Sequence, residues 1–238
     1  MFDGRALATD RPSLEFPVMN YWTIPGRFDF SVPEAQWISD LNGIAADLEA
    51  SARLCKRFLV ESKRLSKLPE TDHGAWIEEF FSVGDIFFSA IVRYGRTFTS
   101  GTRSGIPSEW IAALSEEQQE SHHYFKTLRD KFIAHSVNRL EDNQVFVVLK
   151  AGDDGGEVPD HIMVDRGRLL MPSHEEVEAL NQLCTQLLAR VEGEITMETE
   201  RLLCLAKTIP VEELKTRGTE AVPIPKKEAT FQVRKGFK

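Results

Sequence analysis

The chain has 238 residues, 42% of them hydrophobic and 15 of them phenylalanine, which is enough for one large domain with a buried core. Its 37 acidic residues outnumber 29 basic ones, and the net charge of −8 excludes a broad nucleic-acid-coating surface while leaving room for a local basic cleft. The sequence contains no apolar run of bilayer length and no secretory signal in residues 1–30, so we expect a cytoplasmic protein without a membrane partner.

Four prolines and little periodicity predict an extended N-terminal arm over residues 1–33. Pro33 then opens a helix over 34–66, in which apolar residues recur with helical spacing. The next helix, 74–98, is apolar on more than one face, which is typical of the centre of a bundle or a dimer interface. A loop follows at 100–105. The stripe of the first helix consists of Trp37, Leu41, Ile44, Leu48, Cys55, Phe58 and Leu65.

Pro107 predicts a short helix, and Ser115 with Gln118 forms a capping-box pattern for a third main helix, in which Phe125, Leu128 and Phe132 share one stripe. The period then changes. Residues 145–149 predict a strand, and 162–164 with 169–171 predict one or two return strands. Ser173 caps a last long helix that reaches about Leu205, and 209–238 is expected to be a loosely ordered tail.

The predicted fold is therefore mainly α. It is an antiparallel bundle of four main helices over residues 34–208, with a small β-hairpin inserted at about 143–171 before the last helix.

The segment most informative about chemistry lies at the predicted end of the third helix, where Arg129 and Asp130 are followed by four residues and then His135. Arginine stays charged and binds phosphate through two parallel hydrogen bonds, and histidine transfers protons near neutral pH. These side chains can cleave RNA without a metal. On one continuous helix, positions six apart are displaced by about 9 Å, so either the helix ends between them or a second copy contributes.

This pattern resembles the signature of the HEPN superfamily, especially that of its abortive-infection and toxin types. In that signature, Arg is followed by Asn, Asp or His, then by four residues, and then by His. The resemblance implies a homodimeric, metal-independent endoribonuclease without a cofactor. Arg129 would stabilise the charge on the phosphate, His135 would act as general base or acid, and Asp130 would orient one of them. The expected RNA-binding residues are Lys131, Ser136 and Asn138, the last of which could instead cap the helix.

Two interpretations stay open. The first is an RNase that acts as a toxin or anti-phage defence effector, with RNA as its substrate and a cognate antitoxin or defence-system protein as its partner. The second is a catalytically silent HEPN-like module that binds a partner protein, RNA or nucleotide. The plainest alternative for Arg129, Asp130 and Lys131 is a solvated helix face, and for His135 a helix-end residue favoured by the helix dipole.

The remaining polar residues predict structure rather than chemistry. The adjacent His122 and His123 point about 100° apart on a helix and cannot chelate one ion, so we expect them to face solvent, and we expect no metal site. The acidic run 153–157 predicts a hairpin turn. The three cysteines lack CxxC spacing and are expected to be reduced, buried thiols. Interhelical hydrogen bonds or salt bridges are the favoured roles of Asp85, Arg93, Tyr94 and Arg96.

Overall fold

The computed structural model describes residues 28–67, 73–98, 103–133, 143–151, 156–166 and 171–217. The chain divides into two compact units, one spanning residues 31–208 and one containing 28–30 and 209–217 among the described residues. The elements are η1 (Pro33–Ala35), α1 (Gln36–Leu65), α2 (His73–Arg96), α3 (Ser108–Ala112), α4 (Glu116–Leu128), η2 (Arg129–Ile133), β1 (Asn143–Ala151), β2 (Glu157–Arg166), α5 (His174–Lys207) and α6 (Val211–Thr216).

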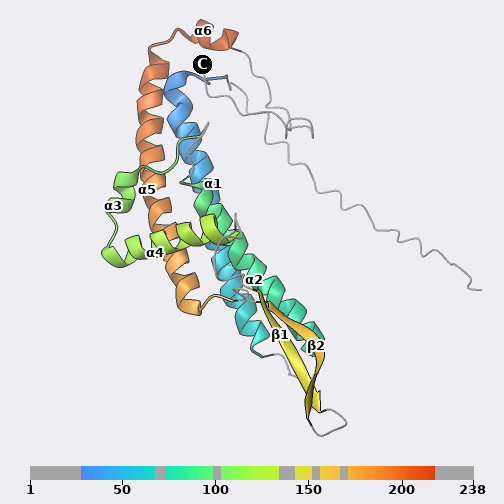
Figure 1. Cartoon of the computed structure of the whole chain (residues 1–238). Helices are drawn as coiled ribbons and strands as arrows, with labels where there is room; N and C mark the ends of the chain where they lie inside the picture. Colours follow the sequence, from blue (N-terminus) through green and yellow to red (C-terminus); the bar gives the residue numbers. More distant parts are fainter. Residues whose placement is uncertain are drawn as a thin grey trace, which may run out of the picture. The chain divides into compact units, whose positions relative to one another are not determined.

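The predicted fold class is confirmed, with four main helices and a two-stranded antiparallel hairpin. Helices α1, α2 and α4 precede the hairpin, and α5, the last long helix, follows it. In the larger unit, α1 packs along both α2 and α5 and runs antiparallel to each, whereas α4 lies across the bundle (Figure 1). The helices meet through their predicted stripes, because the apolar residues spaced three and four apart lie on one face. Fully buried members include Leu41, Ile44, Leu48, Phe58, Phe87, Ile91, Val177, Leu180 and Leu183.

Two helix starts follow from their capping boxes. Ser115 accepts a hydrogen bond from the Gln118 backbone, and the Gln118 side chain accepts one from the Ser115 backbone; Ser173 and Glu176 repeat this exchange at the start of α5. Each box satisfies two backbone N–H groups that the first helical turn leaves without partners. The sequence located both starts to the residue.

Helix α2 is apolar on more than one face, as predicted. Val83, Phe87 and Ile91 are buried in the core, whereas Ile77 and Phe81 are exposed. Val92, nearer the C-terminal end, is also exposed, so α2 is less enclosed than its composition suggests.

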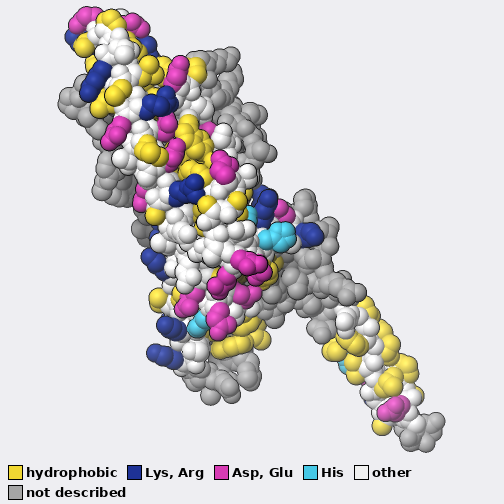
Figure 2. Space-filling view, turned by 90° about the vertical axis from the view of Figure 1, so that its left-hand side faces the viewer, with side chains coloured by type: hydrophobic (Ala, Val, Ile, Leu, Met, Phe, Trp, Pro, Cys, Tyr) yellow, Lys and Arg dark blue, Asp and Glu magenta, His cyan; other side chains and the backbone are white. Residues whose placement is uncertain are grey.

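Strands β1 and β2 pair in antiparallel register, with Val145 opposite Val164 and Val147 opposite Ile162. Side chains of directly opposed residues share one face of a hairpin, and Leu149 follows on that face by alternation. All five are exposed, and Figure 2 shows hydrophobic side chains gathered on the hairpin. The hairpin covers part of the predicted segment 143–171; Met171 lies outside either strand, and 167–170 lie outside the described residues.

Three details differ from the predictions. Cys55 and Cys184 are buried free thiols, but Cys204 is free and exposed, because it lies off the buried stripe of α5. Asp85 is exposed on α2 rather than buried between helices. A short helix, α6, lies within the segment expected to be a loosely ordered tail. In the smaller of the two units, the Arg217 guanidinium carbon lies 5.8 Å from the centroid of the Phe30 ring. No described helix combines the length and apolarity required to span a membrane.

Candidate functional site

The predicted motif begins where α4 changes its winding. The α-helix ends at Leu128, and Arg129–Ile133 form one turn of π-helix, η2. Single π-helical turns are rare in proteins, and those that occur are frequently found at functional sites. The change of winding means that Arg129 and the residues after it do not continue the α-helical phase of α4. His135, Ser136 and Asn138 lie outside the described residues.

Arg129 is held in a defined position by two contacts. Its Nη1 donates a hydrogen bond to Asp130 Oδ1 over 2.6 Å, and the two side chains form an ion pair. Its stem lies against Gly95 of α2, where an added Cβ would be 2.8 Å from Arg129 Cγ. The side chain keeps 32% of its surface exposed. Arg129 therefore combines a stem packed against α2 with a side chain that is partly open to solvent.

Replacing Gly95 with alanine should lower the activity that depends on Arg129 while the chain remains folded. The new methyl group would require Arg129 Cγ to move, and displacements of about 1 Å at a reacting site can cost about 100-fold in rate. Alanine favours helix over glycine by up to about 1 kcal/mol, whereas the clash with the Arg129 stem costs about 1–3 kcal/mol, so the free energy of unfolding should fall by no more than about 2 kcal/mol. An assay of the Arg129-dependent activity and urea denaturation measure the two effects.

Gly193→Ala on α5 is the matched control for this substitution, because no atom lies within 4 Å of its added Cβ. It should leave the Arg129-dependent activity unchanged. Equal activities in the two glycine variants would contradict a positioning role for the Gly95–Arg129 contact.

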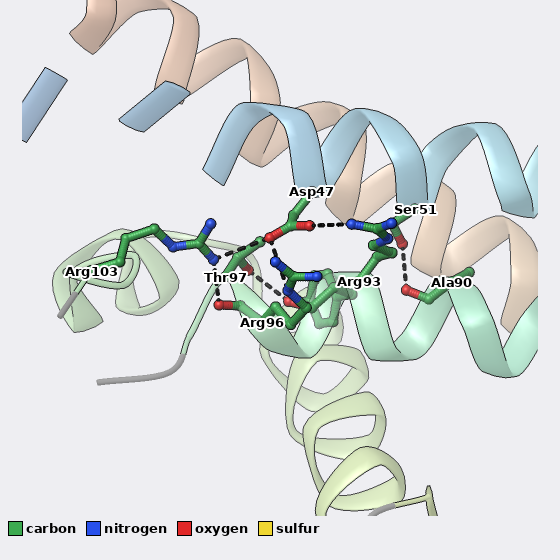
Figure 3. A network of polar contacts seen from close by, with 8 residues as sticks. Asp47, Ser51, Ala90, Arg93, Arg96, Thr97 and Arg103 are labelled. Carbon is green, nitrogen blue, oxygen red and sulfur yellow. Dashed lines mark hydrogen bonds and ion pairs between the residues drawn. The ribbon is translucent and has the colours of Figure 1, made fainter. Parts of the chain in front are cut away.

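A second polar cluster, which the sequence did not predict as a unit, centres on Asp47 of α1. Asp47 is 4% exposed and pairs with Arg93 at 3.1 Å, Arg96 at 3.4 Å and Arg103 at 3.1 Å. Figure 3 shows the carboxylate between guanidiniums that come from α2 and from the segment after it. Nearby, Ser51 Oγ donates to the Ala90 carbonyl over 2.9 Å. The interhelical roles expected of Arg93 and Arg96 are therefore confirmed.

The segment that contains Arg103 packs against one face of α1. Gly43, one turn before Asp47, leaves room for the Arg103 side chain, since an added Cβ would be 2.9 Å from Arg103 Nη1. Asp40, a further turn back and buried, accepts the Ser104 N–H over 3.0 Å. Arg103 Nη2 also donates to the Arg96 carbonyl near the end of α2. In the sequence, the helical spacing of Asp40, Gly43 and Asp47 places these residues on one face of α1, but it does not identify Arg103 and Ser104 as their partners.

Tyr94 and His122 form an interhelical hydrogen bond of 2.8 Å between α2 and α4, which confirms the role expected of Tyr94. The expectation that His122 faces solvent is wrong: its ring is half-buried and packs edge-on against Phe98, 4.6 Å between centroids. Burial, with smaller effects of Lys126 and His123, lowers the pKa of His122 to about 4, and burial raises the pKa of Tyr94. His122 is neutral at pH 7 and acts as a structural partner there.

Arg129 lines neither of two surface pockets. One of about 570 Å³ is open along α4, and another of about 280 Å³ lies between α1 and α2. The first is lined by Glu116, Gln119, Glu120, His123, Tyr124 and Thr127. Among the side chains that the structure describes, no group of three or more His, Cys, Asp or Glu is arranged to hold a metal ion.

Comparisons with protein-family models, curated proteins and solved structures found no match for this chain.

Proposed function

We propose that this chain is a metal-independent endoribonuclease of HEPN type that acts as a homodimer. The observation that carries the proposal is the state of Arg129: it stands at the start of a π-helical turn, contacts Gly95 and Asp130, and keeps its side chain partly exposed. An arginine held in this way is preorganised to bind a phosphate as negative charge develops on it.

In the proposed reaction the ribose 2′-oxygen attacks the adjacent phosphorus and the bond to the 5′-oxygen breaks. His135 takes the 2′-hydroxyl proton as general base or supplies a proton to the leaving oxygen as general acid. Arg129 stabilises the phosphoryl oxygens, and Asp130 orients Arg129 through their hydrogen bond. The products are a 2′,3′-cyclic phosphate and a 5′-hydroxyl. A second copy of the motif would supply the other proton-transfer group.

Cleavage of structured and single-stranded RNA in EDTA tests this proposal. The wild-type chain should produce 2′,3′-cyclic phosphate ends, and His135→Ala should be slower by about 100- to 10,000-fold, because it loses the proton-transfer group. Circular dichroism and size-exclusion chromatography should show both chains folded and dimeric. A folded dimeric wild type that leaves RNA intact would contradict the nuclease proposal and favour the catalytically silent binding module.

As a toxin or defence effector, the proposed nuclease would slow the growth of cells that overproduce it, and His135→Ala would restore growth. We propose that a cognate antitoxin or defence-system partner controls it in the cell.

A further inference from the structure

The β1–β2 hairpin has one apolar face that remains largely open to solvent. Val147 and Ile162 lie opposite each other at its centre and are 56% and 60% exposed. Within the part of the chain that the structure describes, the sheet has only these two strands. A two-stranded hairpin is marginally stable at best in water unless further structure packs on it. The face, called the hairpin face below, consists of Val145, Val147, Leu149, Ile162 and Val164.

The opposite face of the hairpin mixes polar and apolar residues. Side chains alternate along a strand, so Gln144 and Lys150 point away from the hairpin face. Lys150 Nζ pairs with Asp160 Oδ1 over 2.9 Å, and Asp160 Oδ2 pairs with His161 Nδ1 over 2.8 Å. The ion pairs of the hairpin therefore form away from the hairpin face, whose five residues carry no charge.

The charges of the hairpin do not suit RNA or an anionic membrane. Phosphates and anionic lipid headgroups are bound by available cations. Among the hairpin side chains that the structure describes, Lys150 is paired with Asp160, and Glu157 adds a further negative charge. A second copy of this chain presents an identical uncharged face, so packing two hairpin faces together places no like charges opposite each other.

The area of the hairpin face is sufficient for a weak, specific contact between two copies. Burying one aliphatic side chain completely removes roughly 60–120 Å² of apolar surface from water. The five residues are 49–67% exposed, so two faces together would bury roughly 300–700 Å² of apolar surface. Since apolar atoms make up about 60% of an interface, the total is roughly 600–1,100 Å², at the low end of specific interfaces. We therefore expect a reversible, concentration-dependent dimer.

The hairpin is also joined directly to the predicted motif. Residues 134–142 connect η2 to β1, and eight residue steps separate His135 from Asn143. A chain of this length spans at most about 28 Å. Two copies held together through their hairpins would thus each keep His135 within about 28 Å of the shared interface.

We propose that the hairpin face is the surface through which two copies of this chain associate, with the apolar faces of their hairpins packed against each other. The inference goes beyond the proposed function and does not depend on cleavage, because the proposed nuclease requires a second copy but assigns no surface to it. Two stacked hairpins form a small two-layer sheet, in which each hairpin covers the apolar face of the other.

Sedimentation of the full-length chain at about 1 to 200 µM tests the assignment. The wild type should shift from monomer to dimer as its concentration rises. Val147→Lys places a charge at the centre of the hairpin face and should weaken the dimer at least about 100-fold, because the two copies would bring like charges together. Gln144→Lys is the matched control, since it adds the same charge to the opposite face of β1, and it should dimerise like the wild type.

A mixture of two variants tests whether the partner is a second copy. Val147→Lys and Val147→Asp chains should each be monomeric alone, whereas native mass spectrometry of the mixture should show a heterodimer, because the opposite charges attract. Circular dichroism should show every variant folded. A wild type that stays monomeric at all concentrations would overturn the inference, also if it binds phosphatidylcholine vesicles through Val147. Equal dimerisation of the Val147→Lys and Gln144→Lys chains would overturn it as well.

The two proposals can fail separately. A Val147-dependent dimer of a wild type that leaves RNA intact would keep the hairpin interface and contradict the nuclease. A wild type that cleaves RNA as a dimer unaffected by Val147→Lys would keep the nuclease and overturn the hairpin interface.

Discussion

Arg129→Ala should reduce the rate of RNA cleavage by about 100- to 1,000-fold while the chain remains folded. The reason is that removing one preorganised donor from a developing oxyanion costs catalysis on this scale. The structure also indicates why stability should change little: the Arg129 side chain is partly exposed, and its ion-pair partner Asp130 is 45% exposed. Single-turnover cleavage with saturating enzyme measures the chemical step, and thermal unfolding measures the fold.

Two companion variants separate charge from geometry in this experiment. Lys126→Ala removes an exposed positive charge one turn earlier on α4 and should retain nearly full activity. Arg129→Lys should remain well below wild type, because an ammonium cannot reproduce the bidentate contact. An Arg129→Ala chain that cleaves as fast as Lys126→Ala would contradict a catalytic role for Arg129.

Asp47→Ala should lower the free energy of unfolding by about 3 kcal/mol, the lower end of the range for breaking a buried ion pair, because two of its three partners are half-exposed and can be hydrated. The substitution leaves three guanidiniums facing one another and releases the segment that Arg103 fastens to α1. Urea denaturation followed by circular dichroism measures the change. Added salt should recover part of the loss, since it screens repulsion between the remaining charges.

Asp85→Ala on α2 removes an exposed aspartate and should change the free energy of unfolding by no more than about 0.5 kcal/mol. An Asp47→Ala chain as stable as Asp85→Ala would show that the arginine cluster does not contribute to holding α1, α2 and the following segment together.

The long helices could be predicted from the sequence because their signals are local. Apolar residues at helical spacing identify the buried faces of α1 and α5, and the serines at 115 and 173 determine where α4 and α5 begin. The continuous apolar run at 145–149 similarly identifies β1. In each case, residues within a few positions of one another are sufficient to determine the structure.

The site was less predictable because its contacts are made between distant segments. Asp47 meets Arg103 across 56 residues, and His122 meets Tyr94 across 28. Nothing local to His122 distinguishes it from the exposed His123. The π-helical turn at Arg129, which packs against α2, has no recognisable sequence pattern. The motif could be found by its spacing, whereas the arginine cluster required the folded chain.

The packing of α5 along α1 has a consequence for synthesis on the ribosome. Residue 65 ends α1 and residue 174 begins α5, so 108 residues separate the two helices. Translation proceeds at about 5–20 residues per second, so roughly 5–20 s pass between the synthesis of α1 and the start of α5. During this time α5 cannot cover the apolar face of α1. Nascent chains at this stage are candidates for chaperone binding, and translation arrested before residue 174 should yield aggregation-prone fragments. A bundle closed by its last long helix can therefore assemble only late in translation.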